Sequence, residues 1–241
     1  MNRPLERIFS EVAPRYELVN HVLTFGLDAV WRRKAARLAA RGGGALWLDV
    51  CSGTGDMARS LSRHASGRPK IVVVDFCPAM IEKIRTERRT AHFLPVLAEA
   101  ARLPFPDRTF DLVTISFATR NITTSPEALL GHLREFHRVL RPGGRFLNLE
   151  TSQPRHPLVR KLFHAYIRRT VGPVGFFLSG SRAGYAYLSS TIPRFYSARE
   201  FSILLGQARF GRVHVKPLFF GVAAIHLAFK EHARLAGRKN T

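Results

Sequence analysis

Short apolar runs alternate with longer amphipathic stretches through the middle of this 241-residue chain, and this alternation constrains the fold more than any other feature. The short runs are rich in β-branched residues, which predicts strands at 45–50, 71–75, 93–97, 110–116 and 145–150. The stretches between them have helical spacing and predict helices at 56–64, 78–88 and 126–140. Strands that alternate with helices form βαβ units, so we expect an α/β fold with a doubly wound parallel sheet.

The two ends of the chain differ from this alternating core. Residues 1–43 have helical spacing and end in consecutive glycines, which predicts an N-terminal helical cap followed by a loop. Residues 155–192 are helical in pattern, basic and aromatic, and we expect them to form a lid. Residues 231–241 are typical of a basic tail. No repeat or low-complexity block divides the chain, so we expect a single domain over residues 1–230.

Two further features complete the expected sheet. The turn formers Arg141-Pro142-Gly143-Gly144 end the third helix and lead the chain into the fifth strand. Residues 213–218 and 222–229 are apolar runs separated by Phe219-Phe220-Gly221, which predicts a closing, hairpin-like pair of strands.

The balance of charges is unusual. Lysine and arginine together number 38 against 17 aspartates and glutamates, which gives a net charge of +21. A field of this sign attracts nucleic acid, an anionic membrane surface or an acidic small molecule. Because most of the excess is arginine spread along the whole chain, an arginine-rich composition explains it equally well.

The remaining composition narrows the class of protein. Hydrophobic residues make up 46% and charged residues 23% of the chain, which excludes wholesale disorder. No run of about 18 apolar residues occurs, and no apolar run follows Met1, so we expect neither a spanning helix nor a signal peptide. Two cysteines make no disulfide framework and suit a reducing compartment. We therefore expect a soluble, cytoplasmic protein.

The strongest functional signal is an apolar strand that runs into a glycine turn and then into a helix, at residues 47–56. Gly53 and Gly55 allow the backbone to pass close beneath a ligand. Asp49, at the strand tip, can order this turn and interact with a cation, while the following helix N-terminus favours a carboxylate. Asp75 ends the next strand, where a carboxylate can bind both hydroxyls of a ribose. This spacing predicts a nucleotide ligand.

The residues after the turn indicate which nucleotide. A dinucleotide site requires a third glycine that brings backbone onto a pyrophosphate. Here Gly53-Thr54-Gly55 is followed by Asp56-Met57-Ala58, so an acid lies where the phosphates would be. An acid-rich turn suits a ligand with a cationic centre, which favours S-adenosylmethionine over NAD.

Motifs outside the turn make the chain similar to a known family. The stretches concerned are 9–20 with its continuation to Trp31, 103–111, 115–121 and 221–226. In these motifs the chain resembles the class I S-adenosylmethionine methyltransferases, and within them the quinone C-methyltransferases of menaquinone and ubiquinone biosynthesis. The resemblance covers about residues 9–230. It implies a seven-stranded, mostly parallel Rossmann-like sheet with a reversed last strand, and methyl transfer to a ring carbon of a reduced polyprenyl quinol.

The resemblance also implies roles for individual residues. Carried over position by position, it assigns cofactor contacts to Thr54, Asp75, Glu99, Ala100 and Ser116. Glu99 is a departure, because the family usually has asparagine beside the adenine; a carboxylate still accepts a hydrogen bond from the adenine amino group. Thr124 stands where the family commonly has an acid, which bears on how the acceptor is positioned.

The reaction also requires a group that activates the acceptor, because a phenol with a pKa of about 10 is mostly protonated at neutral pH. We predict that Arg120, at the end of the fourth strand, stabilises a quinolate or binds an activating water, with Asn121 orienting it. The alternative for Arg120 is a structural ion pair with a nearby carboxylate.

Tyr187 and His226 are secondary catalytic candidates. Tyr187, with Tyr185, lies in the helix expected to cap the pocket, where an aromatic ring can pack on a flat quinol; core packing explains the pair equally well. His226 lies on the last strand, where a hydrogen-bonded core histidine is the competing interpretation.

The expected partners follow from the substrate and the charge. Residues 155–169 place an apolar stripe between cations, which suits the surface of an anionic membrane, while a lid helix packed on the core is the alternative. A homo-oligomer is compatible with the sequence. No Cys-x-x-Cys or His-Glu-x-x-His spacing occurs, so we expect no metal site.

Rival functions remain. An RNA methyltransferase suits the charge of +21, but no Pro-Pro pair is present for the motif that such enzymes use on exocyclic base amines. A dehydrogenase is disfavoured by the broken dinucleotide glycines. A non-catalytic lipid-binding protein is disfavoured by the presence of Asp49 and Asp75.

Overall fold

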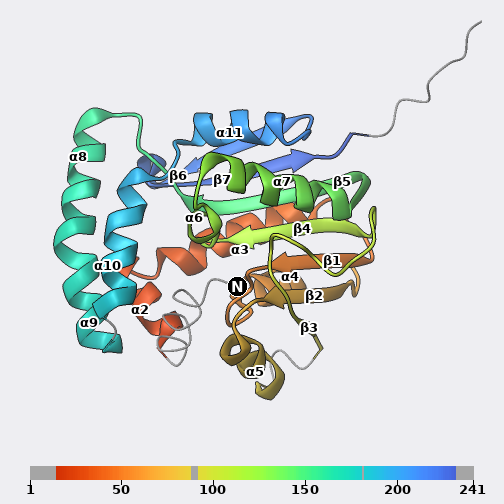
Figure 1. The fold of residues 1–241 in the computed structure, drawn as a ribbon, viewed down its shortest axis with the longest axis horizontal. Coiled ribbons are helices and arrows are strands. Elements are labelled where there is room, and N and C mark those ends of the chain that lie inside the picture. Colours follow the sequence, from red (N-terminus) through yellow and green to blue (C-terminus); the bar gives the residue numbers. More distant parts are fainter. Residues whose placement is uncertain (1–14, 88–91, 181, 232–241) are drawn as a thin grey trace, which may run out of the picture.

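The computed structural model describes residues 15–87, 92–180 and 182–231 (Figure 1). Three sequence features fall outside this part: residues 9–14 of the N-terminal motif, the tail from residue 232 onward, and the side chain of Tyr187. Among the described residues no helix is long and apolar enough to cross a membrane.

Seven strands form a single sheet in the order β3-β2-β1-β4-β5-β7-β6. Their bounds are β1 Leu46–Val50, β2 Lys70–Asp75, β3 Leu94–Leu97, β4 Phe110–Ser116, β5 Leu140–Thr151, β6 Val213–Leu218 and β7 Ala223–Phe229. β1 to β5 pair in parallel, while β7 runs antiparallel to both β5 and β6. The predicted mostly parallel sheet with a reversed last strand is therefore confirmed.

Helices occupy the connections between these strands. They are α2 Tyr16–Leu23, α3 Leu27–Ala40, α4 Asp56–His64, α5 Pro78–Thr86, α6 Thr119–Ile122, α7 Pro126–Val139, α8 Pro157–Tyr166, α9 Gly172–Ser179, α10 Arg182–Thr191 and α11 Ala198–Gln207. Short turns of helix lie at η2 Ile167–Val171, η3 Ile192–Arg194 and η4 Phe219–Gly221. The described residues of the expected lid, 155–192, thus include α8, η2, α9, α10 and the start of η3.

Local sequence explains where several helices begin. Ser125 accepts a hydrogen bond from the Ala128 N–H and starts α7, with Pro126 in the first turn. Ser197 and Glu200 form a reciprocal capping box at the start of α11. α4 follows Gly55, whose φ of 84° is in the left-handed region that glycine adopts readily.

Most predicted boundaries lie within two residues of those in the structure, and the largest difference is in the fifth strand. The fifth strand was expected at residues 145–150, after a turn at 141–144, but β5 begins at Leu140. The turn formers lie inside the strand, where the register with β4 shifts between Phe110 and Leu112. The single residue 111 of β4 therefore stands opposite the four residues 141–144 of β5, and this bulge of three extra residues tolerates Pro142 and the two glycines.

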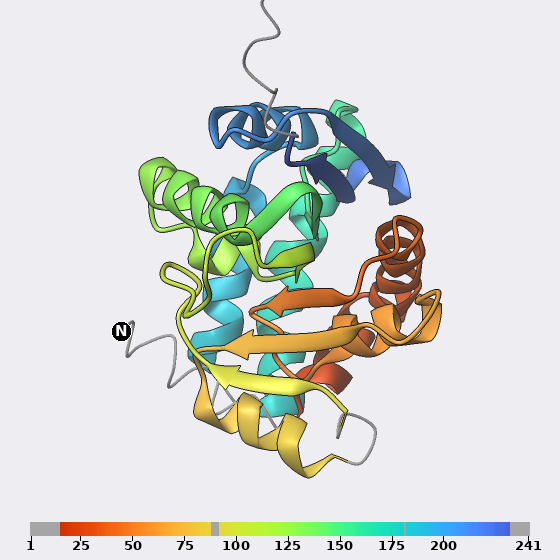
Figure 2. The ribbon, with the colours of Figure 1, turned by 90° about the vertical axis from the view of Figure 1, so that its right-hand side faces the viewer.

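The two faces of the sheet carry different helices. α7 and α11 pack on the face that holds Leu48 and Val50, while α3 and α4 pack on the face that holds Trp47 and Val73 (Figure 2). Because neighbouring residues of a strand point to opposite faces, a nearly continuous apolar strand supplies both cores.

A third core lies beside the sheet. Buried residues of α2 contact buried residues of α8, η2 and α10, among them Val19, Phe163 and Tyr185. Figure 1 shows these helices together at one end of the molecule, beyond the carboxyl ends of β1 and β4. The expected N-terminal cap and the expected lid therefore pack against each other through their described residues.

The chain order also places the site. The chain leads from β1 outward to β2 and β3, then crosses to β4 on the other side of β1. In an open α/β sheet, ligands bind in the crevice at the carboxyl ends of the strands where the order reverses. This point lies between β1 and β4.

Candidate active site

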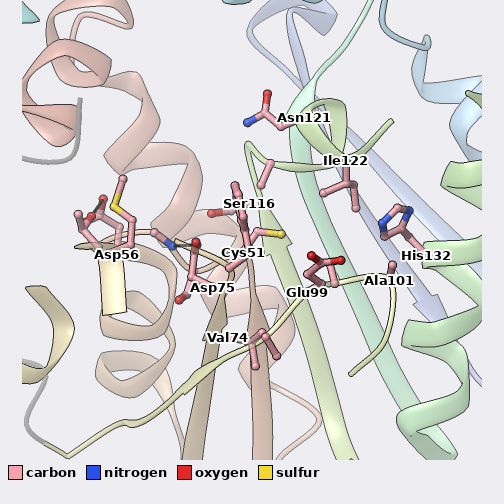
Figure 3. Close-up of a pocket in the computed structure, with 18 of the residues that line it drawn as sticks. Cys51, Asp56, Val74, Asp75, Glu99, Ala101, Ser116, Asn121, Ile122 and His132 are labelled. Atoms are coloured by element: carbon pink, nitrogen blue, oxygen red, sulfur yellow. Dashed lines mark hydrogen bonds between the residues drawn. The ribbon is translucent and has the colours of Figure 1, made fainter. Parts of the chain in front are cut away.

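A cavity of about 230 Å³ lies at this reversal point. Residues that follow the ends of β1, β2, β3 and β4 line it, joined by side chains from α3 and α7 (Figure 3). Of the predicted cofactor residues, Gly53, Thr54, Asp75, Glu99, Ala100 and Ser116 line the cavity. Asp49 and Gly55 do not line it.

The buried carboxylate of Asp75 holds the glycine turn against β2. Its Oδ2 accepts a hydrogen bond from the Gly53 N–H at 2.8 Å, and its Oδ1 accepts one from the Cys77 N–H at 3.0 Å. Burial raises the pKa of Asp75 above its ordinary value, although these backbone donors oppose the rise. Each carboxylate oxygen has a second lone pair, so Asp75 can also accept from the hydroxyls of a ribose.

The turn itself is open towards the cavity. Gly53 has a φ of 54°, and a Cβ added there meets no atom within 4 Å. Cys51, one residue after β1, adopts a φ of 51° that a side chain rarely takes. The backbone therefore bends sharply at this point, and the space above Gly53 is available to a ligand.

Asp49, the fourth residue of β1, is 1% exposed. Its Oδ1 accepts a hydrogen bond from the Thr114 hydroxyl at 2.7 Å, while its Oδ2 has no hydrogen-bond partner among the described residues. Burial raises the pKa of this carboxyl to about 7. The hydrogen bond from Thr114 therefore joins Asp49 of β1 to β4.

Asp56 also lines the cavity, but its charge is compensated. Arg59 forms an ion pair with Asp56 and another with Glu87. The acid that distinguished the turn from a dinucleotide site is thus present at the predicted place, and an arginine on the same helix balances it.

Glu99 and His132 lie on one side of the cavity (Figure 3). The His132 Nδ1–H donates to the carbonyl oxygen of Ala128 at 2.7 Å, which leaves the other ring nitrogen as an acceptor. Burial lowers the pKa of His132, so its neutral form is favoured. Sequence reasoning missed His132, because helical spacing in α7 does not show which side chain reaches past the end of the sheet.

Arg32, on α3, was also missed. Its Nη1–H donates to Asp28 Oδ2 at 2.6 Å, and its guanidinium lies 5.1 Å from the centre of the Phe117 ring. Its Nε is buried with no hydrogen-bond partner among the described residues. Burial alone would raise the pKa of Asp28, but Arg32 and Thr24 hold it below the ordinary value. Asp28 and Arg32 are four residues apart, and oppositely charged residues at this spacing on a helix lie close together, so the sequence could have predicted this ion pair.

The predicted catalytic residues divide into two groups. Asn121 lines the cavity, together with Thr124. Arg120 does not line it: the Arg120 Nη1–H donates to Glu150 Oε1 at 3.1 Å, and the Nη2–H donates to Asn121 Oδ1 at 3.4 Å. The ion pair that was the alternative interpretation of Arg120 is therefore present, and so is the predicted contact with Asn121.

His226 lies away from the cavity, in the core beneath α11. Its Nε2–H donates to the carbonyl oxygen of Ala198 at 2.9 Å, and its ring packs edge-on against Phe201. Burial lowers its pKa. His226 is therefore a hydrogen-bonded core histidine, which was the competing interpretation of this residue. Tyr185 is buried in the third core. Tyr187 lies on α10, and its side chain is not among those that the structure describes.

No group of three or more His, Cys, Asp or Glu side chains that could hold a metal ion occurs in the part of the chain that the structure describes.

Comparisons with known proteins agree with this arrangement. Residues 2–230 match the model of the ubiE/COQ5 methyltransferase family. The demethylmenaquinone methyltransferase of Thermus thermophilus is 38% identical over 222 residues, which cover 91% of this chain and 98% of that protein. The ubiquinone/menaquinone biosynthesis C-methyltransferase UbiE of Geobacter sulfurreducens is 35% identical over 227 residues, which cover 92% of this chain and 87% of that protein.

Solved structures share the fold. A SAM-dependent methyltransferase from Thermotoga maritima superposes with a TM-score of 0.62 at 17% identity, over 93% of this chain and 99% of that one. A SAM-dependent methyltransferase from Aquifex aeolicus gives a TM-score of 0.54 at 19% identity, over 77% and 82%. The fold likeness and the family match confirm the resemblance drawn from the motifs: this chain belongs to the ubiE/COQ5 methyltransferase family.

Proposed function

We propose that this chain transfers a methyl group from S-adenosylmethionine to a ring carbon of a reduced polyprenyl quinol. The observation that carries the proposal is the cavity at the carboxyl ends of β1, β2 and β4. The chain belongs to a methyltransferase family, and its relatives are named for menaquinone and ubiquinone biosynthesis. The acceptor is a demethylmenaquinol or a methoxy-benzoquinol.

The residues around the cavity fit this cofactor. Asp75 binds the ribose hydroxyls, and the open space above Gly53 accommodates the part of the ligand that crosses the turn. Glu99 accepts from the adenine amino group, and the unprotonated nitrogen of His132 offers a second acceptor on the same side. When bound, S-adenosylmethionine supplies an electrophilic methyl carbon.

Arg32 binds the carboxylate of the methionine portion. Its guanidinium lines the cavity and keeps a buried Nε–H with no partner among the described residues, and a buried donor of this kind is costly unless a ligand pairs with it. Asp28 holds the guanidinium in place from α3. An arginine is well suited to the role because its planar fork matches a carboxylate.

Asn121 contacts the acceptor. A guanidinium only donates, so the contact with Arg120 fixes the Asn121 oxygen and leaves its NH₂ group free to donate elsewhere. Because the amide lines the cavity, its NH₂ group stabilises the negative charge that develops on the quinol oxygen as the proton leaves. Arg120, held by Glu150, acts as a positioning residue for this amide.

The quinol chemistry requires only that the acceptor be held and deprotonated. The phenolic proton would leave to a base. The methyl–sulfur bond of a bound S-adenosylmethionine would break as the ring carbon takes the methyl group, which leaves S-adenosylhomocysteine. The methylated ring carbon would then give its own proton to a base, so that the ring regains aromaticity. The cavity contributes by holding the reacting carbon in line with the methyl group, at a separation near 3–3.5 Å, which is worth several kcal/mol.

We further propose that the protein contacts an anionic membrane from the side of α8–α10. Leu158 and Leu162 on α8 and Phe177 on α9 are exposed, and the surrounding chain is basic. A polyprenyl tail lies in the bilayer, so a peripheral contact brings the ring of the acceptor to the protein.

The test is methyl transfer from labelled S-adenosylmethionine to two short-tailed, chemically reduced acceptors. One is a demethylmenaquinol analogue and the other a methoxy-benzoquinol analogue. Turnover of either supports the proposal and identifies the ring. If neither is methylated while the cofactor binds, the quinol assignment is wrong, and an RNA acceptor, favoured by the charge of +21, is tested next.

A further inference from the structure

A second hollow lies on the surface beside β6 and β7. It is a groove of about 1440 Å³ that shares no lining residue with the cavity of the candidate active site. The start of α8, the start of α11, the outer strand β6 and the turn η4 border it. Figure 1 shows the first turns of α8 and α11 at the same end of the molecule as the turn between β6 and β7.

The groove is positively charged. Arg155, Arg160 and Arg199 line it, and no aspartate or glutamate is among the described residues that do. The acid next to Arg199 is Glu200, whose carboxylate accepts from the Ser197 backbone N–H at 2.8 Å and so belongs to the capping box of α11. Three exposed guanidinium groups around one hollow favour an anion.

The first turns of two helices border the same space. His156 and Val159, at the start of α8, and Ser197 and Ala198, at the start of α11, all line the groove. The first N–H groups of a helix have no acceptor within the helix, and the helix dipole makes that end positive. Part of this capacity is already used, because the Glu200 N–H of α11 donates to the Ser197 hydroxyl and Pro157 of α8 has no N–H, so the arginines supply most of the attraction for an anion.

A buried hydroxyl provides an independent sign of a ligand. Ser152, one residue after β5, is 3% exposed and lines the groove, and its Oγ has no hydrogen-bond partner among the described residues. The Ser152 backbone N–H donates to the Val222 carbonyl oxygen, which holds the residue in place, but its hydroxyl has no hydrogen-bond partner among the described residues. An unpaired buried hydroxyl is unfavourable, which indicates a partner that binds from the groove.

The rim of the groove is apolar. Phe220 lines it and is 78% exposed, and its neighbour Phe219 is 55% exposed. Both adopt left-handed backbone conformations, with φ of 56° and 43°, which cost free energy for residues with side chains. Exposed apolar side chains beside polar residues mark surfaces that contact a partner protein or a membrane.

We propose that this groove binds the phosphodiester headgroup of an anionic phospholipid, with Phe219 and Phe220 inserted among the acyl chains. The combination of a cationic hollow and an exposed aromatic rim matches an amphiphile rather than a free anion. This inference rests on the proposed function, because it supplies the docking site that brings the chain to a membrane-bound quinol.

The test measures binding of the full chain to vesicles by co-sedimentation. Vesicles of phosphatidylcholine alone are compared with vesicles that also contain phosphatidylglycerol. The groove variant is Arg155→Ala with Arg160→Ala and Arg199→Ala. The matched control is Arg33→Ala with Arg37→Ala and Arg41→Ala, which removes the same charge from exposed positions on or next to α3.

The expected result separates the site from the overall charge. Wild type and control bind the anionic vesicles with similar affinity, while the groove variant binds about tenfold or more weakly and Ser152→Ala about threefold more weakly. Equal losses in the two triple variants would assign binding to the net charge and overturn the proposal. Displacement of the vesicles by a short RNA, at constant ionic strength, would also overturn it.

A fluorescent side chain on the rim of the groove tests whether that rim inserts into the membrane. Phe220→Trp places an exposed indole on the rim, whereas the two native tryptophans, Trp31 and Trp47, are buried. Brominated acyl chains in phosphatidylglycerol vesicles are expected to quench the new indole. Binding of the variant without quenching would contradict insertion of the rim.

Failure of the membrane-docking proposal can be distinguished from failure of the proposed methyltransferase function. Methyl transfer to a short-tailed quinol in solution needs no vesicle. If wild type does not methylate that acceptor, the proposed function fails while the vesicle result stands. If it does, and both triple variants bind vesicles alike, only the present inference fails.

Discussion

Arg120 and Glu150 form an ion pair in the interior of the protein, with 3.1 Å between Nη1 and Oε1 and exposed fractions of 6% and 1%. Glu150 also accepts from the backbone N–H of Arg120 through its other oxygen, at 3.2 Å. The pair thereby joins α6, which follows β4, to the end of β5, and the neighbouring Asn121 lines the cavity.

Removing one charge of this pair tests its structural role. Glu150→Gln leaves the Arg120 guanidinium buried without a counter-charge, which is expected to lower the free energy of unfolding by about 3–5 kcal/mol. Denaturant unfolding measures the change. Glu135→Gln is the matched control, because it breaks a more exposed pair with Arg138 and is expected to cost about 1 kcal/mol or less.

Arg120→Lys separates positioning from structure. Lysine retains the charge but not the planar fork that reaches Glu150 and Asn121 together. We expect kcat to fall about tenfold or more, with little change in the Kd of S-adenosylhomocysteine. An unchanged kcat in a folded variant would limit Arg120 to a structural role.

Asp75 is expected to control cofactor affinity. In Asp75→Asn a single amide oxygen replaces two acceptors that serve the Gly53 and Cys77 N–H groups, and the contact with the ribose is weakened. The Kd of S-adenosylhomocysteine is expected to rise about 100-fold, as measured by calorimetry. Asp107→Asn, at an exposed carboxylate, is the control and should leave that Kd unchanged.

Gly53 and Gly67 offer a matched pair of glycines. Both have positive φ, and a Cβ at either meets no atom within 4 Å, but only Gly53 lines the cavity. Alanine at either position is expected to lower stability by about 1–2 kcal/mol because of the left-handed backbone. Only Gly53→Ala should also weaken cofactor binding, since its methyl group enters the ligand space; equal Kd values for the two variants would contradict this.

Arg32 is expected to recognise the amino-acid part of the cofactor. Arg32→Met should weaken binding of S-adenosylhomocysteine about tenfold or more, but should have much less effect on 5′-methylthioadenosine, which lacks the carboxylate. Arg33→Met, at the exposed neighbouring position, controls for the loss of charge. If both ligands weaken equally, Arg32 supports the fold and does not bind the carboxylate.

Asp49 makes stability depend on pH. Burial raises its pKa in the folded protein to about 7 from the ordinary value of 3.8, so the folded state binds the proton more tightly than the unfolded state. Its contribution to stability therefore falls as the pH rises between about 4 and 7, by roughly 2–4 kcal/mol. Asp49→Asn removes this dependence while keeping an acceptor for Thr114.

Unfolding of wild type and Asp49→Asn across this pH range measures the difference. The stability of the variant is expected to rise relative to wild type as the pH increases. A constant difference between the two proteins would show that Asp49 is ionised throughout the range.

Local sequence determined the elements and the nucleotide end of the site. The alternation of apolar runs and helical stretches predicted the parallel sheet, since strand and helix periods are properties of neighbouring residues. The glycine turn and Asp75 were predictable for the same reason: a turn and a strand end are local, and the carboxyl ends of parallel strands always meet at one edge of the sheet.

Only the tertiary structure decided which distant side chains meet. Arg120 and Glu150 are 30 residues apart, and sequence left open whether Arg120 faced a substrate or a carboxylate. His226 lies in the core because β7 packs beneath α11. Arg32 and His132 line the cavity because α3 and α7 pack on the two faces of the sheet beside it. A helix period fixes which residues share a face, but packing against other elements fixes what that face meets.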